Sequence, residues 1–373
     1  MGGVASPKTM RLSTRVLWTA LPLCLVGAIA VAVGLAVGDS PSKATAARAP
    51  GTRSHAAVSS DTFTFVGGGD IALTGNRNAA VFAGISRFLR NKNLVVGNLE
   101  GTLATGGASK CGPGSSGCFA FRGSPGWAAT LRAAGFMVLN VANNHALDYG
   151  PGAQSETLAA LRRARIVHTG LPGQIAYVRA GTVKVALIGC APYRWAQSLL
   201  DVRGSAALVR KAARDADVVL VYMHAGAEGT GAEHVRNADE TFLGERRGNP
   251  VRFAHTMIKA GADLVFASGP HVLRGIEWYR GRLIAYSLGN LAATNTLSTD
   301  GSLAFSSLLR VTLDRRGRFA TGSIVPLRLV GDGTPVYDSG RAAIGVIRAL
   351  SRADFGPRAI RISTTGRLSA PKT

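Results

Sequence analysis

Short apolar runs alternate with helix-like segments along most of this chain. The runs are rich in β-branched and aromatic residues and show little polar alternation, which is typical of strands buried on both faces. In order, they read "TFTFVGGGD", "NLVVGNLEG", "FMVLNVANNH", "VKVALIGCAP", "DVVLVYMHAG", "ADLVFASGPH" and "RLIAYSLGN". Strands that alternate with helical segments favour an α/β domain, with layered β-sheets flanked by helices.

The segments between and after these runs predict further elements. Residues 154–164 and 251–260 have the apolar spacing of amphipathic helices, and Gly261 is a typical helix stop. The segment "SSLLRVTLDRRGRFATGSIVPLRLV" predicts an antiparallel hairpin with "RRG" in its turn. A basic C-terminal tail, 331–373, follows the hairpin, and we expect it to carry one helix near 341–350.

A long apolar run near the N-terminus bears on the compartment. Residues 16–37 are long enough to cross a bilayer, which needs roughly 20 apolar residues, and they follow a basic segment, 1–15, expected to stay in the cytoplasm. This favours an uncleaved transmembrane signal anchor over a cleavable signal peptide, although the small residues at 44–47 keep cleavage open. A flexible linker, 38–60, would then lead to a folded extracytoplasmic domain, 61–330, of a single-pass protein of the cell membrane.

Composition adds a strong positive charge to this picture. The 373 residues are 46% hydrophobic, which is a globular composition, and the formal net charge is +22, mostly from arginine. Such a surface favours polyanionic partners, although a solvated basic surface without a partner is the alternative. No compact Lys/Arg run with interleaved aromatic residues is present, so nucleic acid is not an expected partner.

The cysteines fit a chain that leaves the cytoplasm. Cys111 and Cys118 bracket the loop "CGPGSSGC", and in an oxidising compartment we expect them to form a disulfide. The alternative, a metal-binding pair, would need closer spacing and further ligands nearby. Cys190, within "VALIGCAPY", is expected to be a buried packing thiol rather than a nucleophile.

The predicted strands end on side chains that bind metals. These ends carry a carboxylate, an amide or an imidazole, at Asp70, Glu100, Asn143–His145, His224 and His271. Each residue alone could cap a turn or be a structural histidine. Because ligand sites of open α/β sheets lie beyond the carboxyl ends of the strands, we expect these side chains to meet. A mixed oxygen and nitrogen donor set suits manganese, zinc or iron, as one or two divalent ions.

The motifs at these strand ends resemble those of a known family. The segments "GGGDIAL", "VVGNLEGTL", "NVANNHALDYG", "VYMHAGAEG" and "GADLVFASGPHVLRGIEWYRGRLIAYSLGN" occur in one order between Phe63 and Leu329. They resemble the CapA family of poly-γ-glutamate capsule synthesis proteins, which share the calcineurin-like metallophosphoesterase fold. The resemblance therefore implies that fold for most of the folded chain.

The resemblance also implies a role for each strand-end residue. Asp70 matches the aspartate that holds one metal after the first strand, and Glu100 matches the carboxylate that bridges two metals after the second. Asn144 stands where the family's Gly-Asn-His motif places a metal-binding amide. His224 and His271 match two later imidazole ligands.

Other residues of the same motifs are expected around the metal. The resemblance implies that His145 reaches the substrate as a general acid. Asp148, three residues later, could orient the His145 ring or could cap the following helix, and both alternatives remain open. Asn143, Glu228 and Asn290 are expected to support the ligands or shape the pocket rim.

The chain departs from the wider phosphoesterase pattern at two positions. Ala72 stands where a histidine usually follows the first aspartate, and Ser268–Gly269 replace one of two final histidines, so only His271 remains. Fewer imidazoles imply weaker binding, a harder metal such as manganese, a single ion, or loss of the site.

Two classes of function follow from these observations. The first is a membrane-anchored, metal-dependent hydrolase that acts outside the cell on an envelope polymer or its precursor. The second is a non-catalytic subunit of a capsule polymer synthesis or export complex that binds an acidic chain. The resemblance implies a part in poly-γ-glutamate synthesis or export, and the basic surface suits that acidic polymer in either case. A nuclease would share the fold, but the outward topology argues against it.

Overall fold

The computed structural model describes residues 62–76, 78–113 and 116–372. The predicted cytoplasmic segment 1–15, the transmembrane anchor 16–37 and the linker 38–60 lie outside the described residues. Within the described residues, no helix has the length and apolar character needed to cross a membrane.

Two stacked β-sheets form the centre of the domain. Their strand orders follow, with the bounds of each strand. The first sheet runs β19 (Arg361–Ile362), β20 (Arg367–Ser369), β17 (Phe319–Val330), β16 (Phe305–Asp314), β1 (Thr62–Ala72), β2 (Leu94–Leu99), β5 (Val138–Asn140) and β6 (Val167–Thr169), with β15 (Asn290–Ala293) beside β1 and β18 (Thr334–Tyr337) beside β17. The second runs β13 (Ile276–Tyr279), β14 (Arg282–Ala285), β12 (Leu264–Ser268), β9 (Val218–His224), β8 (Val183–Cys190) and β7 (Ala176–Ala180).

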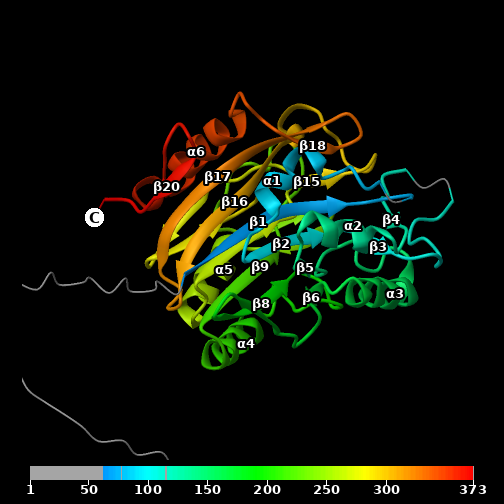
Figure 1. The fold of residues 1–373 in the computed structure, drawn as a ribbon, viewed down its shortest axis with the longest axis horizontal. Coiled ribbons are helices and arrows are strands. Elements are labelled where there is room, and N and C mark those ends of the chain that lie inside the picture. Colours follow the sequence, from blue (N-terminus) through cyan, green and yellow to red (C-terminus); the bar gives the residue numbers. More distant parts are fainter. Residues whose placement is uncertain (1–61, 77, 114–115, 373) are drawn as a thin grey trace, which may run out of the picture. The chain divides into compact units, whose positions relative to one another are not determined.

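Helices cover the outer faces of both sheets (Figure 1). The helices on the first sheet are α1 (Ser86–Leu89), α2 (Trp127–Ala134) and α3 (Gly150–Arg163), and those on the second are α4 (Val202–Asp215) and α5 (Pro250–Ala260). A sixth helix, α6 (Ala342–Phe355), packs against β13, β16 and β17. The expected mixed α/β architecture with layered sheets and flanking helices is confirmed.

Successive residues of a strand point to opposite faces of its sheet, and both faces are covered here, which explains the long apolar runs. Phe65 of β1 and Tyr222 of β9 point into the core between the sheets, whereas their neighbours Val66 and Val221 pack against the outer helices. Every position of such a strand meets an apolar layer on one side or the other. A strand covered on both faces therefore has no need of polar alternation.

The individual predictions can be compared with the elements. The predicted helices over 154–164 and 251–260 are confirmed as α3 and α5, and α5 ends at Gly261 with a left-handed φ of 115°. The predicted hairpin is confirmed as β16 and β17, which pair antiparallel.

The C-terminal segment forms more structure than one helix. Its helix, α6, extends five residues beyond the expected end at 350. The segment also contributes β18, β19 and β20, and β18 and β20 pair with β17. These short strands extend the first sheet on the side away from β2.

The parallel strands bring their carboxyl ends to one side of the domain. β1, β2 and β5 are parallel neighbours in the first sheet, and β8, β9 and β12 are parallel neighbours in the second. In Figure 1 the arrowheads of β1, β2 and β5 point the same way. Loops that follow these strands therefore meet above the packed core, where ligand sites of α/β sheets lie.

Candidate metal centre

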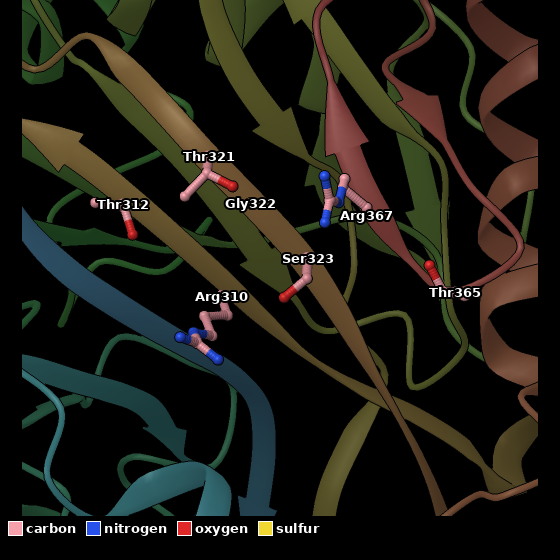
Figure 2. A pocket seen from close by; sticks show the side chains of 7 residues that line it. All are labelled: Arg310, Thr312, Thr321, Gly322, Ser323, Thr365 and Arg367. Carbon is pink, nitrogen blue, oxygen red and sulfur yellow. The ribbon is translucent and has the colours of Figure 1, made fainter.

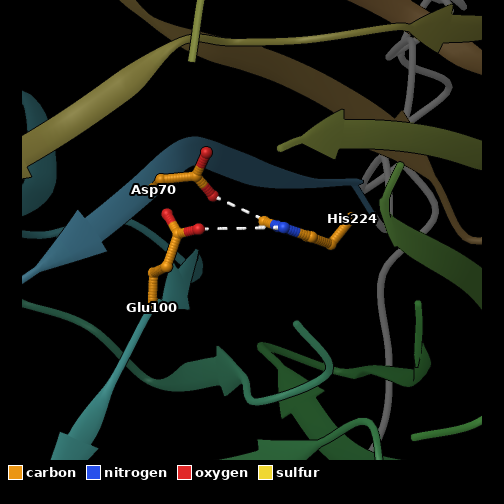
Figure 3. A group of neighbouring side chains, drawn as sticks. All are labelled: Asp70, Glu100 and His224. Carbon is orange, nitrogen blue, oxygen red and sulfur yellow. Dashed lines mark ion pairs between the residues drawn. The ribbon is translucent and has the colours of Figure 1, made fainter. Parts of the chain in front are cut away.

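Three buried side chains from three strand ends face one another. Asp70 is on β1, Glu100 directly follows β2, and His224 is the last residue of β9. One ligand atom of each lies within 4.8 Å of the others (Figure 3). Because β1 and β2 belong to one sheet and β9 to the other, the packing of the two sheets assembles the group.

Asp70 receives four nitrogen contacts. Its Oδ1 lies 3.5 Å from His224 Nδ1, and its Oδ2 lies 3.3 Å from His271 Nδ1. The Asn98 side-chain amide donates to Oδ1 at 2.8 Å, and the Gly269 backbone N–H donates to Oδ2 at 3.0 Å. Burial alone would raise the pKa of Asp70, but the two imidazoles outweigh it and hold the pKa well below its ordinary value.

Glu100 is buried without a hydrogen-bond partner. Neither of its side-chain oxygens has a partner among the described residues, and its side chain is fully buried. Its Oε1 lies 3.7 Å from His224 Nε2 and 3.8 Å from His271 Nε2, which is too long for a hydrogen bond. Burial, with the Asp70 charge, raises the pKa of Glu100 well above its ordinary value. A buried carboxylate without hydrogen bonds is costly, so this position favours a cation beside it.

His271 and Asn144 complete the ring of donors. The Nδ1 of His271 lies 2.8 Å from Asn290 Oδ1, which leaves Nε2 directed toward Glu100 and Glu228. Asn144 Oδ1 lies 2.9 Å from His224 Nε2. Burial lowers the pKa of His271, but the carboxylates of Glu100, Asp70 and Glu228 outweigh it and raise the pKa to about 10.

Asn98 joins these donors and is absent from the sequence-based prediction. Its amide nitrogen donates to Asp70 and lies 3.3 Å from His224 Nδ1. Its oxygen accepts from Asn140 at 2.7 Å and from Asn143 at 3.1 Å. Asn143 therefore supports the site from behind rather than facing it. The available signal was a polar residue inside the apolar run "LVVGNLEG".

His145 lies beside the cluster with Asp148 behind its ring. Asp148 Oδ2 lies 2.7 Å from His145 Nδ1, and its Oδ1 forms an ion pair with Lys110 Nζ at 2.7 Å. The His145 ring stacks on Phe121 with centroids 4.2 Å apart. The side chain of Asp148 makes no cap hydrogen bond to α3, whose N-cap residue is Tyr149. Of the two alternatives for Asp148, the geometry fits orientation of the imidazole.

A cleft opens beside His145. One lobe, about 290 Å³, is lined by His145, Glu228, His271 and Asn290 together with aromatic and apolar side chains. Cys111 and Cys118 form a disulfide at one side, with Cα atoms 5.6 Å apart, and the adjacent Phe119 is 60% exposed.

The second lobe of the cleft has a charged wall. This lobe, about 360 Å³, shares His145 and Glu228 with the first and adds Lys110 and Arg247. Arg247 is almost fully buried and pairs with Glu228 at 2.5 Å and Glu245 at 3.1 Å. Glu228 thus bridges the buried arginine and His271, at the rim where it was expected.

Two glycines permit the backbone to approach this closely. A Cβ on Gly69 would lie 1.8 Å from the Gly289 carbonyl oxygen, where β1 runs against the turn before β15. Gly269 has φ of 112°, and a Cβ there would lie 3.0 Å from the Ala225 nitrogen and 3.3 Å from the His224 ring. Larger residues at either position would separate the strand ends that carry the donors.

The donor set fits a divalent metal ion. Two carboxylates, two imidazoles and an amide oxygen converge, and the unpartnered Glu100 lies among them. Such a mixed set binds zinc, manganese or iron. Asn290 behind His271 and Asn98 behind Asp70 and His224 supply the outer hydrogen bonds that orient metal ligands.

Curated sequences with related segments come from several bacteria. The PGA biosynthesis protein CapA of Bacillus subtilis is 32% identical over 186 residues, which cover 43% of each chain. The capsule biosynthesis protein CapA of Bacillus anthracis is 27% identical over 225 residues, 56% of this chain and 53% of that protein. A probable polyglutamine synthesis accessory protein of Mycobacterium tuberculosis is 29% identical over 220 residues, 52% of this chain and 54% of that one. The chain thus spans about half the length of these curated relatives.

Solved structures with similar arrangements include two nucleotidases. A putative 5'-nucleotidase of Staphylococcus aureus aligns with a TM-score of 0.42 and 14% identity, over 78% of this chain and 58% of that one. The 5'-nucleotidase precursor of Thermus thermophilus aligns with a TM-score of 0.42 and 15% identity, over 78% and 59%.

A family model covers most of the folded domain. The model for the bacterial capsule synthesis protein PGA_cap matches residues 62–295. That range includes every candidate metal ligand described above. The chain therefore belongs to the PGA_cap family of bacterial capsule synthesis proteins.

Proposed function

We propose that this chain is a membrane-anchored, metal-dependent hydrolase of poly-γ-glutamate capsule synthesis. It acts outside the cytoplasm on an envelope polymer or its precursor. Membership of the family and the likeness to the CapA proteins support the capsule assignment. The stacked sheets with donors at the strand ends support a calcineurin-like metallophosphoesterase fold.

Glu100 is the observation that carries this proposal. Its two buried oxygens lack hydrogen-bond partners, and they lie among Asp70, His224 and His271. Removing an ionised carboxylate from water is expensive unless a cation compensates it. These residues and Asn144 would hold a divalent ion that supplies this compensation.

The residues around the ion suit hydrolysis. A divalent ion bound here would lower the pKa of a coordinated water and would polarise the bond under attack. His145 lines the same cleft as His271 and, when protonated at Nε2, would donate that proton to the leaving group. Asp148 accepts the hydrogen bond from His145 Nδ1, which directs Nε2 toward the substrate.

The proposed partners follow from charge and family. An acidic polymer such as poly-γ-glutamate is the substrate or product, and the net charge of +22 favours its approach. The anchor at residues 16–37 holds the chain in the cell membrane, in reach of a capsule synthesis or export complex.

Metal content tests the centre directly. The full chain is purified in detergent without chelator, and bound metals are counted by mass spectrometry. We expect about one or two transition ions per chain, lost in His224→Ala and His271→Ala, because each removes an imidazole donor. His234→Ala is the matched control, because His234 is exposed and pairs with Asp354. A parent that stays empty after manganese and zinc are added contradicts the proposal.

Turnover of a generic phosphodiester tests His145. His145→Ala should lower kcat by about 10²–10⁴-fold, because the leaving group loses its proton donor. Metal content should not change. Turnover that survives His145→Ala removes His145 from this role.

A second function rests on the two missing imidazoles. Ala72 is buried where the wider fold has a histidine, and the Gly269 backbone takes the place of another donor beside Asp70. If these losses weaken metal binding enough to abolish turnover, the chain would act as a non-catalytic subunit that binds the acidic polymer. An empty parent chain that still binds polymer would support this alternative.

A further inference from the structure

A polar groove crosses the outer face of the first sheet, away from the metal centre. It has a volume of about 430 Å³ and is lined by Arg310, Thr312, Thr321, Gly322, Ser323, Thr365 and Arg367 (Figure 2). Arg310, Ser323 and Arg367 are direct cross-strand neighbours on β16, β17 and β20. Strands lie nearly 5 Å apart, so the two arginine Cα atoms are about 10 Å apart with a hydroxyl between them.

The two arginines have no acidic partner. Arg310 and Arg367 are exposed, neither forms an ion pair in the described part of the chain, and no carboxylate lines the groove. Arg367 also lines a neighbouring groove that carries Arg352 and Arg361, again without a carboxylate. The cations of this face are therefore available to an external anion.

In the cleft beside His145, by contrast, the basic side chains have acidic partners. Its lysine and arginine are paired with acidic residues, Lys110 with Asp148 and Arg247 with Glu228 and Glu245. Positive charge is thus compensated at the cleft and uncompensated at Arg310 and Arg367 of the groove. This separation gives the domain two distinct surfaces for two distinct partners.

The groove lies beside the start of the folded domain. Thr312 pairs with Thr64, two residues after Thr62, and their hydroxyl oxygens are 3.2 Å apart. Sixty-one residues precede Thr62, and they include the apolar run 16–37. The metal centre lies at the other end of β1, at Asp70. Asp70 is eight positions after Thr62 along this strand, which is about 26 Å.

We propose that this groove docks the domain on an anionic membrane by binding a phospholipid headgroup. Guanidinium groups bind phosphate oxygens through paired N–H donors, and the threonine and serine hydroxyls supply further donors. Docking here directs the cleft away from the bilayer, toward the envelope. The inference rests on the proposed membrane anchor, which keeps the groove within reach of lipid, and it does not depend on metal or turnover.

Amide exchange on the full chain tests the docking. The chain is reconstituted in vesicles of phosphatidylcholine alone and of equal parts phosphatidylcholine and phosphatidylglycerol. We expect exchange in peptides covering β17 and β20 to be several-fold slower on the anionic vesicles, and the difference to shrink at high salt. The Arg310→Gln/Arg367→Gln variant should lose this protection. Arg236→Gln/Arg246→Gln, which removes the same charge from exposed positions elsewhere, should keep it.

Several outcomes overturn the proposal. Equal exchange on both vesicles, or protection that survives in the groove variant, excludes headgroup binding at the groove. Protection by added poly-γ-glutamate on phosphatidylcholine vesicles, with none from phosphatidylglycerol, assigns the groove to the polymer instead. Metal content is measured in parallel. A chain that binds no metal but still docks through its arginines would contradict the proposed hydrolase and support the docking surface.

Discussion

Asn98 shows how one amide can organise several metal ligands. Its nitrogen contacts Asp70 and His224, and its oxygen accepts from Asn140 and Asn143. It therefore connects donors from both sheets, although it faces no cleft. A fully satisfied buried amide of this kind fixes the orientation of its neighbours, since each partner would otherwise be left unpaired.

We predict that Asn98→Ala weakens metal binding. The expected loss of affinity is about 10–100-fold, because Asp70 and His224 lose the group that orients them. Titration of the metal-free chain with manganese or zinc measures it. Asn93→Ala is the control, because Asn93 is exposed and accepts only from the Thr64 backbone among the described contacts. Unchanged affinity in Asn98→Ala would mean that the ligands are oriented without it.

Cys190 is a buried thiol that we expect to be unreactive in the folded chain. It is fully buried, and burial raises its pKa to about 12, although a hydrogen bond with Ser205 opposes the rise. Because the thiolate is the reactive form, we predict no alkylation of Cys190 at pH 8 in the folded chain and complete alkylation after unfolding. Peptide mass spectrometry locates the label. Rapid labelling of the folded chain would contradict burial of this thiol.

At the scale of elements, Glu277 on β13 joins three neighbouring segments. Its carboxylate contacts His255 of α5 at 2.8 Å, Tyr286 after β14 at 2.7 Å and Arg358 of the short helix η3 (Gly356–Arg358) at 2.7 Å. Burial raises the pKa of Glu277, but these hydrogen bonds outweigh it and leave the pKa below its ordinary value. The ionised carboxylate therefore holds the C-terminal segment against the second sheet.

We predict that Glu277→Gln lowers the free energy of unfolding at pH 7 by about 2–3 kcal/mol, because charge-assisted hydrogen bonds are lost. A carboxylate with a lowered folded pKa stabilises above its unfolded pKa and loses that contribution as the pH falls through the folded value. The difference from the parent should therefore disappear in acid. Urea unfolding across pH measures both effects.

Arg358→Ala should lower the free energy of unfolding by under about 1 kcal/mol, because that side chain is 57% exposed. A constant difference at all pH values would exclude the ionised form as the cause.

At the scale of the whole molecule, packing between the sheets assembles the metal centre. Asp70 and Glu100 lie at strand ends of the first sheet, and His224 and His271 lie at strand ends of the second. Phe266 of β12 lies between the sheets, 4.7 Å from the Phe65 ring and 4.6 Å from the Tyr222 ring. The separation of the sheets at this aromatic cluster sets the distance between the two groups of ligands.

We predict that Phe266→Ala destabilises the domain by about 3–5 kcal/mol and also weakens metal binding, because the cavity lets the sheets shift. Phe253→Ala in α5 is the matched control, since Phe253 is equally buried but packs outside the second sheet. It should cost similar stability and leave metal affinity unchanged. Thermal unfolding and metal titration are measured on both variants. Equal metal affinities would mean that the ligands do not depend on the spacing between the sheets.

The sequence by itself determined the strands, several helices and the residue types at the strand ends. The spacing of apolar residues and the local composition are properties of short segments. The apolar runs, the end of α5 at Gly261 and the β16–β17 hairpin could therefore be predicted without coordinates. Only the tertiary structure decided which strands share a sheet and that two sheets supply one site. It also decided that Asn98 connects the ligands, that Asp148 faces His145, and that Arg310 and Arg367 stand unpaired across one groove. These contacts join residues that are far apart in the chain. Their contributions to stability and binding depend on burial and on distances in space, which a local sequence pattern does not contain.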